Sequence, residues 1–124
     1  MLATAKLQTL IWTSQTSEAE KFYSDVLGLP FKGMSHGALM YDVGGGDLRV
    51  SPVPETAPSA HTVAGFAVDD VAGAMSVLAA RGVRFERFPG FRHDDNGVWT
   101  APDGARVAWL RDPDGNLLSI VQYA

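Results

Sequence analysis

The sequence predicts an α+β fold made of two βαβββ modules, in which each module is a strand, a helix and three further strands. One observation is an internal repeat of about 55 residues, in which a strand, a helix start, an apolar helix stripe, a glycine and a phenylalanine recur in the same order. The repeat aligns Ile11 with Phe66 and Gln15 with Asp70. The other observation is a β-hairpin predicted over residues 107–121, where two apolar runs flank a polar turn.

The first module is expected to place one helix between strands. An apolar, β-branched run over residues 7–12 suits a half-buried strand, and the pattern from Ser17 to Glu20 is a capping box that predicts a helix start. Gly28 stands where this helix would end, after an apolar stripe at helical spacing formed by Ala19, Phe22, Tyr23, Val26 and Leu27. Three further strands are predicted over residues 29–34, 38–43 and 48–53.

A proline-rich stretch over residues 51–60 favours an extended connector over a regular strand or helix. It divides a single predicted domain, residues 1–124, into a first module over residues 1–56 and a second over residues 57–124.

The second module repeats the first and then departs from it. A strand is predicted over residues 62–68, followed by a helix that starts at Asp69-Asp70 and ends at Gly82. Phe85 is expected in the next strand. Residues 89–96 are polar and predict a loop that suits a lid, before a short strand at residues 98–100 and the final hairpin around Pro113-Asp114-Gly115.

Composition excludes several classes of function. The 124 residues are 46% hydrophobic and carry a net charge of −4 with scattered arginines, which argues against a nucleic-acid partner. No cysteine is present, and no apolar run is long enough for a membrane span, so we expect a soluble, cytoplasmic protein that does not bind membranes. No phosphate loop, Ser-His-Asp spacing or carboxylate pair on a helix appears, which argues against hydrolase and nucleotide-binding functions, and no cofactor is expected.

Several motifs together resemble the vicinal oxygen chelate superfamily, which includes glyoxalase I, bleomycin resistance proteins and extradiol dioxygenases. They are the Val26-Leu27-Gly28-Leu29 helix end, the Val68-Asp69-Asp70-Val71 helix start and the turn from Asp112 to Asn116. The resemblance covers nearly the whole chain. It implies the glyoxalase/bleomycin resistance/dioxygenase fold, in which two βαβββ modules form an open cup-shaped mixed sheet with helices outside, and it implies a homodimer.

The same resemblance places the family's metal ligands on residues that bind metal poorly. The positions fall at Gln8, near Val63, near Arg49 or Val50, and at Ser119. An amide, an aliphatic side chain, a cation and a hydroxyl do not supply the imidazole and carboxylate donors that a divalent metal requires. We therefore expect no metal. A shift of two residues would put His61 on the same strand face as Val63.

Three polar side chains allow more than one interpretation. His61 is either a surface histidine or an acid, base or hydrogen-bond donor in a cleft. Arg49 either faces solvent or points into the cup, where it would need an anionic partner. His93, beside Asp94 and Asp95 in the predicted loop, either holds a metal or a proton with them or faces water, and we expect it to face water.

Aromatic residues provide the remaining site candidates. Strand alternation places Trp12 and Trp109 on the sheet faces opposite the helices, and Trp99 with Phe91 lies beside the predicted lid loop. Each of these residues also suits a core position. A cup that lacks metal but contains several indoles is suited to a flat or apolar ligand.

The predicted function is that of a small-molecule binding or sequestering protein that uses Gln8, Trp12, Arg49, Val63, Phe91, Trp99, Trp109 and Ser119. The alternative is an enzyme, either a metal-dependent lyase or dioxygenase with a shifted ligand register, or a metal-free isomerase with His61 as its catalytic base.

Overall fold

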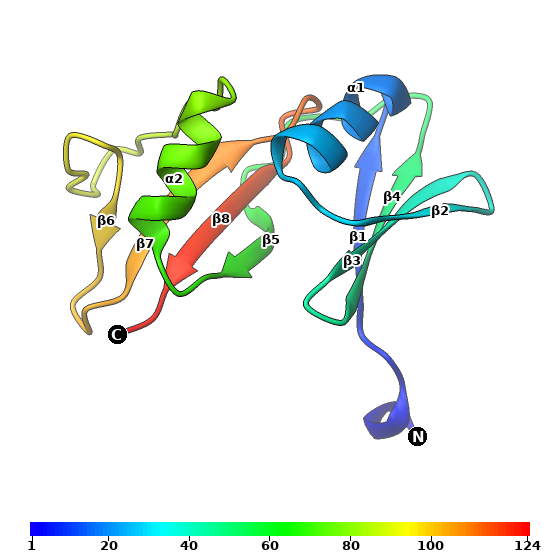
Figure 1. Cartoon of the computed structure of the whole chain (residues 1–124), viewed down its shortest axis with the longest axis horizontal. Helices are drawn as coiled ribbons and strands as arrows, with labels where there is room; N and C mark the ends of the chain where they lie inside the picture. Colours follow the sequence, from blue (N-terminus) through cyan, green and yellow to red (C-terminus); the bar gives the residue numbers. More distant parts are fainter. The chain divides into compact units, whose positions relative to one another are not determined.

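The computed structural model describes residues 1–124, which divide into two compact units, Met1–Ala57 (unit 1) and Pro58–Ala124 (unit 2) (Figure 1). Unit 1 contains η1 (Leu2–Thr4), β1 (Gln8–Thr13), α1 (Thr16–Glu20), η2 (Lys21–Val26), β2 (Phe31–Ser35), β3 (Ala38–Val43) and β4 (Gly46–Pro52). Unit 2 contains β5 (Thr62–Ala67), α2 (Val71–Ala80), β6 (Trp99–Thr100), β7 (Arg106–Arg111) and β8 (Leu117–Gln122). No helix of the structure is both long and apolar enough to cross a membrane.

The two units have the same sheet topology. The four strands of unit 1 lie in the order β1-β4-β3-β2 (sheet A), and those of unit 2 in the order β5-β8-β7-β6 (sheet B). In each sheet the first and last strands of the unit pair in parallel and the other pairs are antiparallel. The predicted α+β class and paired-module topology are therefore confirmed. Gln15 and Asp70, which the internal repeat aligns, are both helix N-cap residues.

Alternation along the strands separates a core face from an open face in each sheet. In sheet A, Ile11 and Thr13 of β1 and Leu48 and Val50 of β4 are buried, together with Tyr23 of η2. In sheet B, the buried alternate residues are Ala108 and Leu110 of β7 and Leu118 and Ile120 of β8, and α2 packs on these two strands. The intervening residues lie on the faces turned away from the helices. We call these the open faces.

The first helix starts differently from the prediction. Helix α1 begins at Thr16 and its N-cap, Gln15, makes no side-chain capping bond, so the predicted capping box from Ser17 to Glu20 is wrong. The chain enters the helix from a tight turn in which the Gln15 N–H donates to the Thr13 hydroxyl. Gly28 follows η2 with a φ of 69°, a left-handed conformation that glycine adopts without steric cost, as the sequence predicts for the helix end.

The segment after α2 is also not the predicted strand. Phe85 lies in irregular chain, and a single backbone bond from the Glu86 N–H to the Trp109 carbonyl, 2.8 Å, joins this segment to β7. The periodicity of residues 83–88 is too weak to specify a pleated strand, so tertiary contacts determine its path. The short β6 then takes the place of a longer strand in the second module.

The predicted hairpin turn between β7 and β8 is organised by the buried carboxylate of Asp112. Its Oδ1 accepts hydrogen bonds from the N–H groups of Asp114 and Asn116, and its Oδ2 accepts one from the Asn116 side chain. Gly115 has a φ of 82°, and a Cβ there would lie 2.9 Å from the Pro58 Cβ. The turn therefore requires both the carboxylate and the glycine.

We expect Asp112→Ala to lower the free energy of unfolding by about 2 to 4 kcal/mol, because it leaves buried N–H groups without an acceptor. Urea titration followed by tryptophan fluorescence measures this loss. The matched control is Asp103→Ala, which removes a carboxylate that accepts from the Ala105 N–H in an exposed turn. The control substitution should lower the free energy of unfolding by about 1 kcal/mol or less. Equal losses in the two variants would contradict the role given to the Asp112 network.

Candidate functional site

The open face of sheet B carries a row of three residues across adjacent strands. Gly65 of β5 pairs with Ser119 of β8, and Ser119 pairs with Trp109 of β7. A Cβ at Gly65 would approach the Ser119 Oγ to 2.9 Å, so glycine keeps this part of the face flat. Small residues thus lie next to a large indole on a surface that no helix of unit 2 covers.

An aromatic cluster, defined as Phe88, Phe91, His93, Trp99 and Trp109, gathers on this open face. The ring centroid of Trp109 lies 5.4 Å from Phe88, 5.7 Å from Phe91, 5.9 Å from His93 and 6.1 Å from Trp99. Phe91 and Trp99 meet edge to face at 4.9 Å. These separations are in the favourable range for aromatic pairs. The loop after α2 and the strands β6 and β7 therefore supply one continuous aromatic surface.

His93 fixes the loop that carries this cluster. Its Nε2 accepts a hydrogen bond from the Phe88 N–H at 3.0 Å, and its Nδ1 lies 2.8 Å from the Gly97 carbonyl oxygen. Because a carbonyl can only accept, Nδ1 must carry the hydrogen, and the ring is the neutral Nδ1–H tautomer. The prediction that His93 faces water is therefore wrong. Both of its nitrogens bind backbone atoms, which a sequence pattern cannot reveal.

Neighbouring charged residues support the same loop. The Asp94 Oδ1 accepts from the N–H groups of Val98 and Asn96, each at 2.9 Å. The bond from Val98 contributes most to holding the pKa of the Asp94 carboxyl below its usual value, so the stabilisation is present at neutral pH and is lost as the pH falls through this lowered pKa. Arg87 donates to the Asp94 and Asp95 carbonyl oxygens.

The other aromatic and cationic candidates lie on the open face of sheet A. Trp12 is 62% exposed, as alternation with the buried Ile11 and Thr13 predicts, and Gln8 lies on the same face of β1. Arg49 is half-buried on β4, where its Nη2 donates to the Ser35 carbonyl at 2.9 Å and its Nη1 lies 3.5 Å from the Met40 sulfur. Arg49 therefore binds the β2–β3 turn region and has no carboxylate partner.

Comparison with known families agrees with this architecture. The sequence model of the Glyoxalase/Bleomycin resistance protein/Dioxygenase superfamily matches residues 7–120. The chain belongs to this superfamily. No curated protein matches the chain.

Solved structures of glyoxalase-family proteins share the fold. A glyoxalase family protein from Bacillus anthracis superimposes with a TM-score of 0.77 at 16% identity, over 98% of this chain and 96% of that one. Lactoylglutathione lyase from Agrobacterium tumefaciens superimposes with a TM-score of 0.70 at 21% identity, over 96% of this chain and 93% of that one. A virulence protein from Salmonella typhimurium superimposes with a TM-score of 0.71 at 20% identity, over 100% of both chains. At these identities the likeness shows the fold.

The donor set does not fit the divalent metal of the superfamily. The amide of Gln8, the guanidinium of Arg49, the aliphatic side chain of Val63 and the hydroxyl of Ser119 do not supply the imidazole and carboxylate donors of such a site. No group of three or more His, Asp or Glu side chains is close enough to hold a metal ion. His61, which a shifted register would recruit, is exposed and has no hydrogen-bond partner that would orient its ring.

Sequence reasoning identified Phe91, Trp99 and Trp109 but missed Phe88 and the role of His93. The five rings of the aromatic cluster come together because the irregular segment after α2 folds back on β7. The one sequence signal was the concentration of aromatic residues around Pro89-Gly90, which by itself does not distinguish a cluster from a surface loop.

We expect His93→Ala to loosen the loop and expose Trp99 and Trp109, because both backbone bonds to the imidazole are lost. Tryptophan emission should shift to longer wavelength and quenching by acrylamide should increase about twofold, while the free energy of unfolding falls by about 1 to 3 kcal/mol. His61→Ala is the matched control, since that imidazole is exposed without a partner. Unchanged quenching in His93→Ala would contradict the anchoring role.

Because the residues at the family's metal-ligand positions lack imidazole and carboxylate donors, we expect the purified protein to retain no stoichiometric divalent metal after desalting. Elemental analysis should find well below one equivalent of nickel, zinc, iron or manganese, and EDTA should leave the melting temperature unchanged. One retained equivalent, or destabilisation by the chelator, would overturn this prediction and favour the enzymatic alternative.

Proposed function

We propose that this superfamily member binds a small, flat, aromatic or apolar organic molecule on the open face of sheet B, without a metal ion. The observation that carries the proposal is the aromatic cluster centred on Trp109. Apolar sites with a few polar groups are typical of small-molecule binding proteins. Binding or sequestration follows the precedent of the superfamily's drug-resistance members.

Exposure of the cluster supports a binding role over a purely structural one. Phe91 is 43% exposed, and the Trp99 and Trp109 side chains are only partly covered. The loop that carries Phe91 is held by His93 and Asp94, so the rings keep their positions without a ligand. A surface organised in this way loses little conformational entropy when a planar ligand stacks on it.

Ser119 supplies a polar group beside the aromatic surface. Its hydroxyl makes no hydrogen bond within the protein and lies next to Gly65 and Trp109 in the cross-strand row. A ligand that stacks on Trp109 could donate to or accept from this hydroxyl, which would fix its orientation.

The histidines favour binding over a reaction. Both nitrogens of His93 are used by backbone groups, and no neighbour orients the exposed His61. A general base must be held within hydrogen-bond reach of the proton it removes. His93 has no nitrogen left for a substrate proton, and the ring of His61 is not held in place by a neighbour.

The test uses 1-naphthol as a planar probe and decahydro-1-naphthol as its saturated counterpart. We expect 1-naphthol to quench tryptophan fluorescence on binding and Trp109→Ala to weaken that binding by roughly 1 to 3 kcal/mol, because the stacking partner is lost. Trp109→Phe, which keeps an aromatic ring, should lose less affinity for 1-naphthol than Trp109→Ala. Isothermal titration calorimetry provides the affinities.

The saturated alcohol should bind more weakly than 1-naphthol to the unmodified protein and should respond less to Trp109→Ala. Equal affinity for the two probes, or 1-naphthol binding that is insensitive to both Trp109 variants, would overturn the proposed function.

A further inference from the structure

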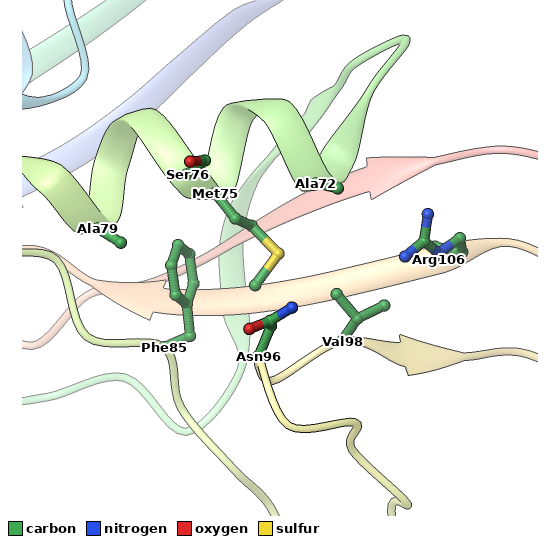
Figure 2. Close-up of a pocket in the computed structure, with 8 residues that line it drawn as sticks. All are labelled: Ala72, Met75, Ser76, Ala79, Phe85, Asn96, Val98 and Arg106. Carbon is green, nitrogen blue, oxygen red and sulfur yellow. The ribbon is translucent and has the colours of Figure 1, made fainter.

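A hollow lies on the helix side of sheet B. Its volume is about 440 Å³, and it is bounded by α2 on one side and by Phe85, Asn96, Val98 and Arg106 on the other (Figure 2). Arg106 shares the strand face of Ala108 and Leu110, which is the face opposite Trp109. The hollow and the aromatic cluster are therefore on opposite sides of the sheet.

Small residues create this space. Helix α2 presents Ala72, Ser76 and Ala79 to the hollow, at the spacing of one helix face. Gly97 allows its loop to pass close to Phe85, because a Cβ at residue 97 would lie 3.2 Å from the Phe85 Cβ. The φ of Gly97 is 105°, which also favours glycine. A larger residue at any of these positions would fill the hollow or displace its wall.

The floor of the hollow is apolar. Met75 extends from α2 toward Asn96 and Val98 (Figure 2). Phe85 also lines the hollow. Met75 is 5% exposed and Val98 is 4% exposed, so both surfaces are fixed parts of the packed unit. An apolar body in contact with them would be removed from water, which favours binding.

Three polar groups at the hollow lack partners in the protein. The Arg106 guanidinium, the Asn96 side-chain amide and the Ser76 hydroxyl make no hydrogen bond to another side chain or to the backbone of a neighbouring segment. The Arg106 charge is one of the smaller causes that lower the pKa of the Asp94 carboxyl, but the two side chains form no ion pair, and the Asp94 Oδ1 accepts from two backbone N–H groups. Arg106 is therefore a cation without a hydrogen-bonded anion beside an apolar floor.

We propose that this hollow binds a small amphipathic carboxylate, with the carboxylate on the Arg106 guanidinium and the apolar body against Met75, Phe85 and Val98. A guanidinium presents paired N–H donors that match the two oxygens of a carboxylate. The volume is within the range of small-molecule sites. This site is additional to the aromatic surface of the proposed function and does not depend on it.

The experiment follows ¹⁵N-labelled protein by NMR as octanoate is added, with 1-octanol as the uncharged probe of equal chain length. Octanoate should shift the amide signals of α2, Asn96, Val98 and Arg106, and leave the three indole N–H signals unchanged. Octanol should bind at least about tenfold more weakly, because it cannot form the charged pair.

Arg106→Gln should reduce octanoate affinity about tenfold and leave octanol affinity unchanged. Arg106→Lys keeps the charge without the paired donors, so its octanoate affinity should lie between that of the unmodified protein and that of Arg106→Gln. Arg92→Gln removes the same charge from an exposed position outside the hollow and should bind octanoate normally. Ala79→Leu, which fills part of the hollow, should weaken both probes.

Equal affinity for octanoate and octanol, shifts centred on the indole N–H signals, or an unchanged affinity in Arg106→Gln would overturn the proposal. The spectrum of each variant shows directly whether it is folded, and Arg106→Lys provides the comparison if Arg106→Gln loses structure. Because 1-naphthol binding reports on Trp109 and octanoate binding on Arg106, failure of either site can be recognised separately.

Discussion

The side chain of Arg111 joins the segment after α2 and the connector at Ser59 to the turn of the β7–β8 hairpin. Its Nε donates to the Glu86 carboxylate at 2.7 Å, and its Nη1 donates to the carbonyl oxygens of Ser59 and Gly115 at 3.0 and 2.7 Å. The ion pair is about one-third exposed, so its contribution is mainly to geometry and little to net stability. Once Glu86 is held, its N–H bonds to the Trp109 carbonyl and Phe88 lies beside the indole. Both proposed ligand surfaces of unit 2 depend on this placement of the segment after α2.

The elements that the sequence predicted correctly are those controlled by local chemistry. Asp70 caps α2 through the Gly73 N–H, Gly82 follows the helix with a φ of 90°, and the turn at residues 112–116 uses the aspartate and glycine expected of it. Each depends on contacts between residues a few positions apart, so the residue types carry the information. The capping box at Ser17 failed because a local turn, in which the Gln15 N–H donates to the Thr13 hydroxyl, makes Gln15 the N-cap two residues before Ser17.

Prediction of the proposed binding surfaces was limited by long-range contacts. Strand alternation correctly put Trp12 and Trp109 opposite the buried strand residues, since the period of two is fixed by the backbone. The backbone bonds of His93 and the position of Phe85 depend on the path of an irregular segment, which has no periodicity to read. Arg106 looked like an ordinary strand cation in the sequence. That its guanidinium has no hydrogen-bonded anion is evident from the packed structure alone.

The parallel pairing of the first and last strand in each unit has a consequence for synthesis on the ribosome. Strand β1 can pair as soon as β4 is made, so sheet A needs residues up to Pro52. Strand β5 has β8 as its sole neighbour and stays unpaired until residues 117–122 are made. Contacts between residues so distant in sequence form slowly, because the intervening chain must first be closed into a loop. Unit 1 can therefore fold during translation, while β5 remains an exposed edge for the time needed to add about 50 residues, roughly 3 to 10 seconds at typical elongation rates.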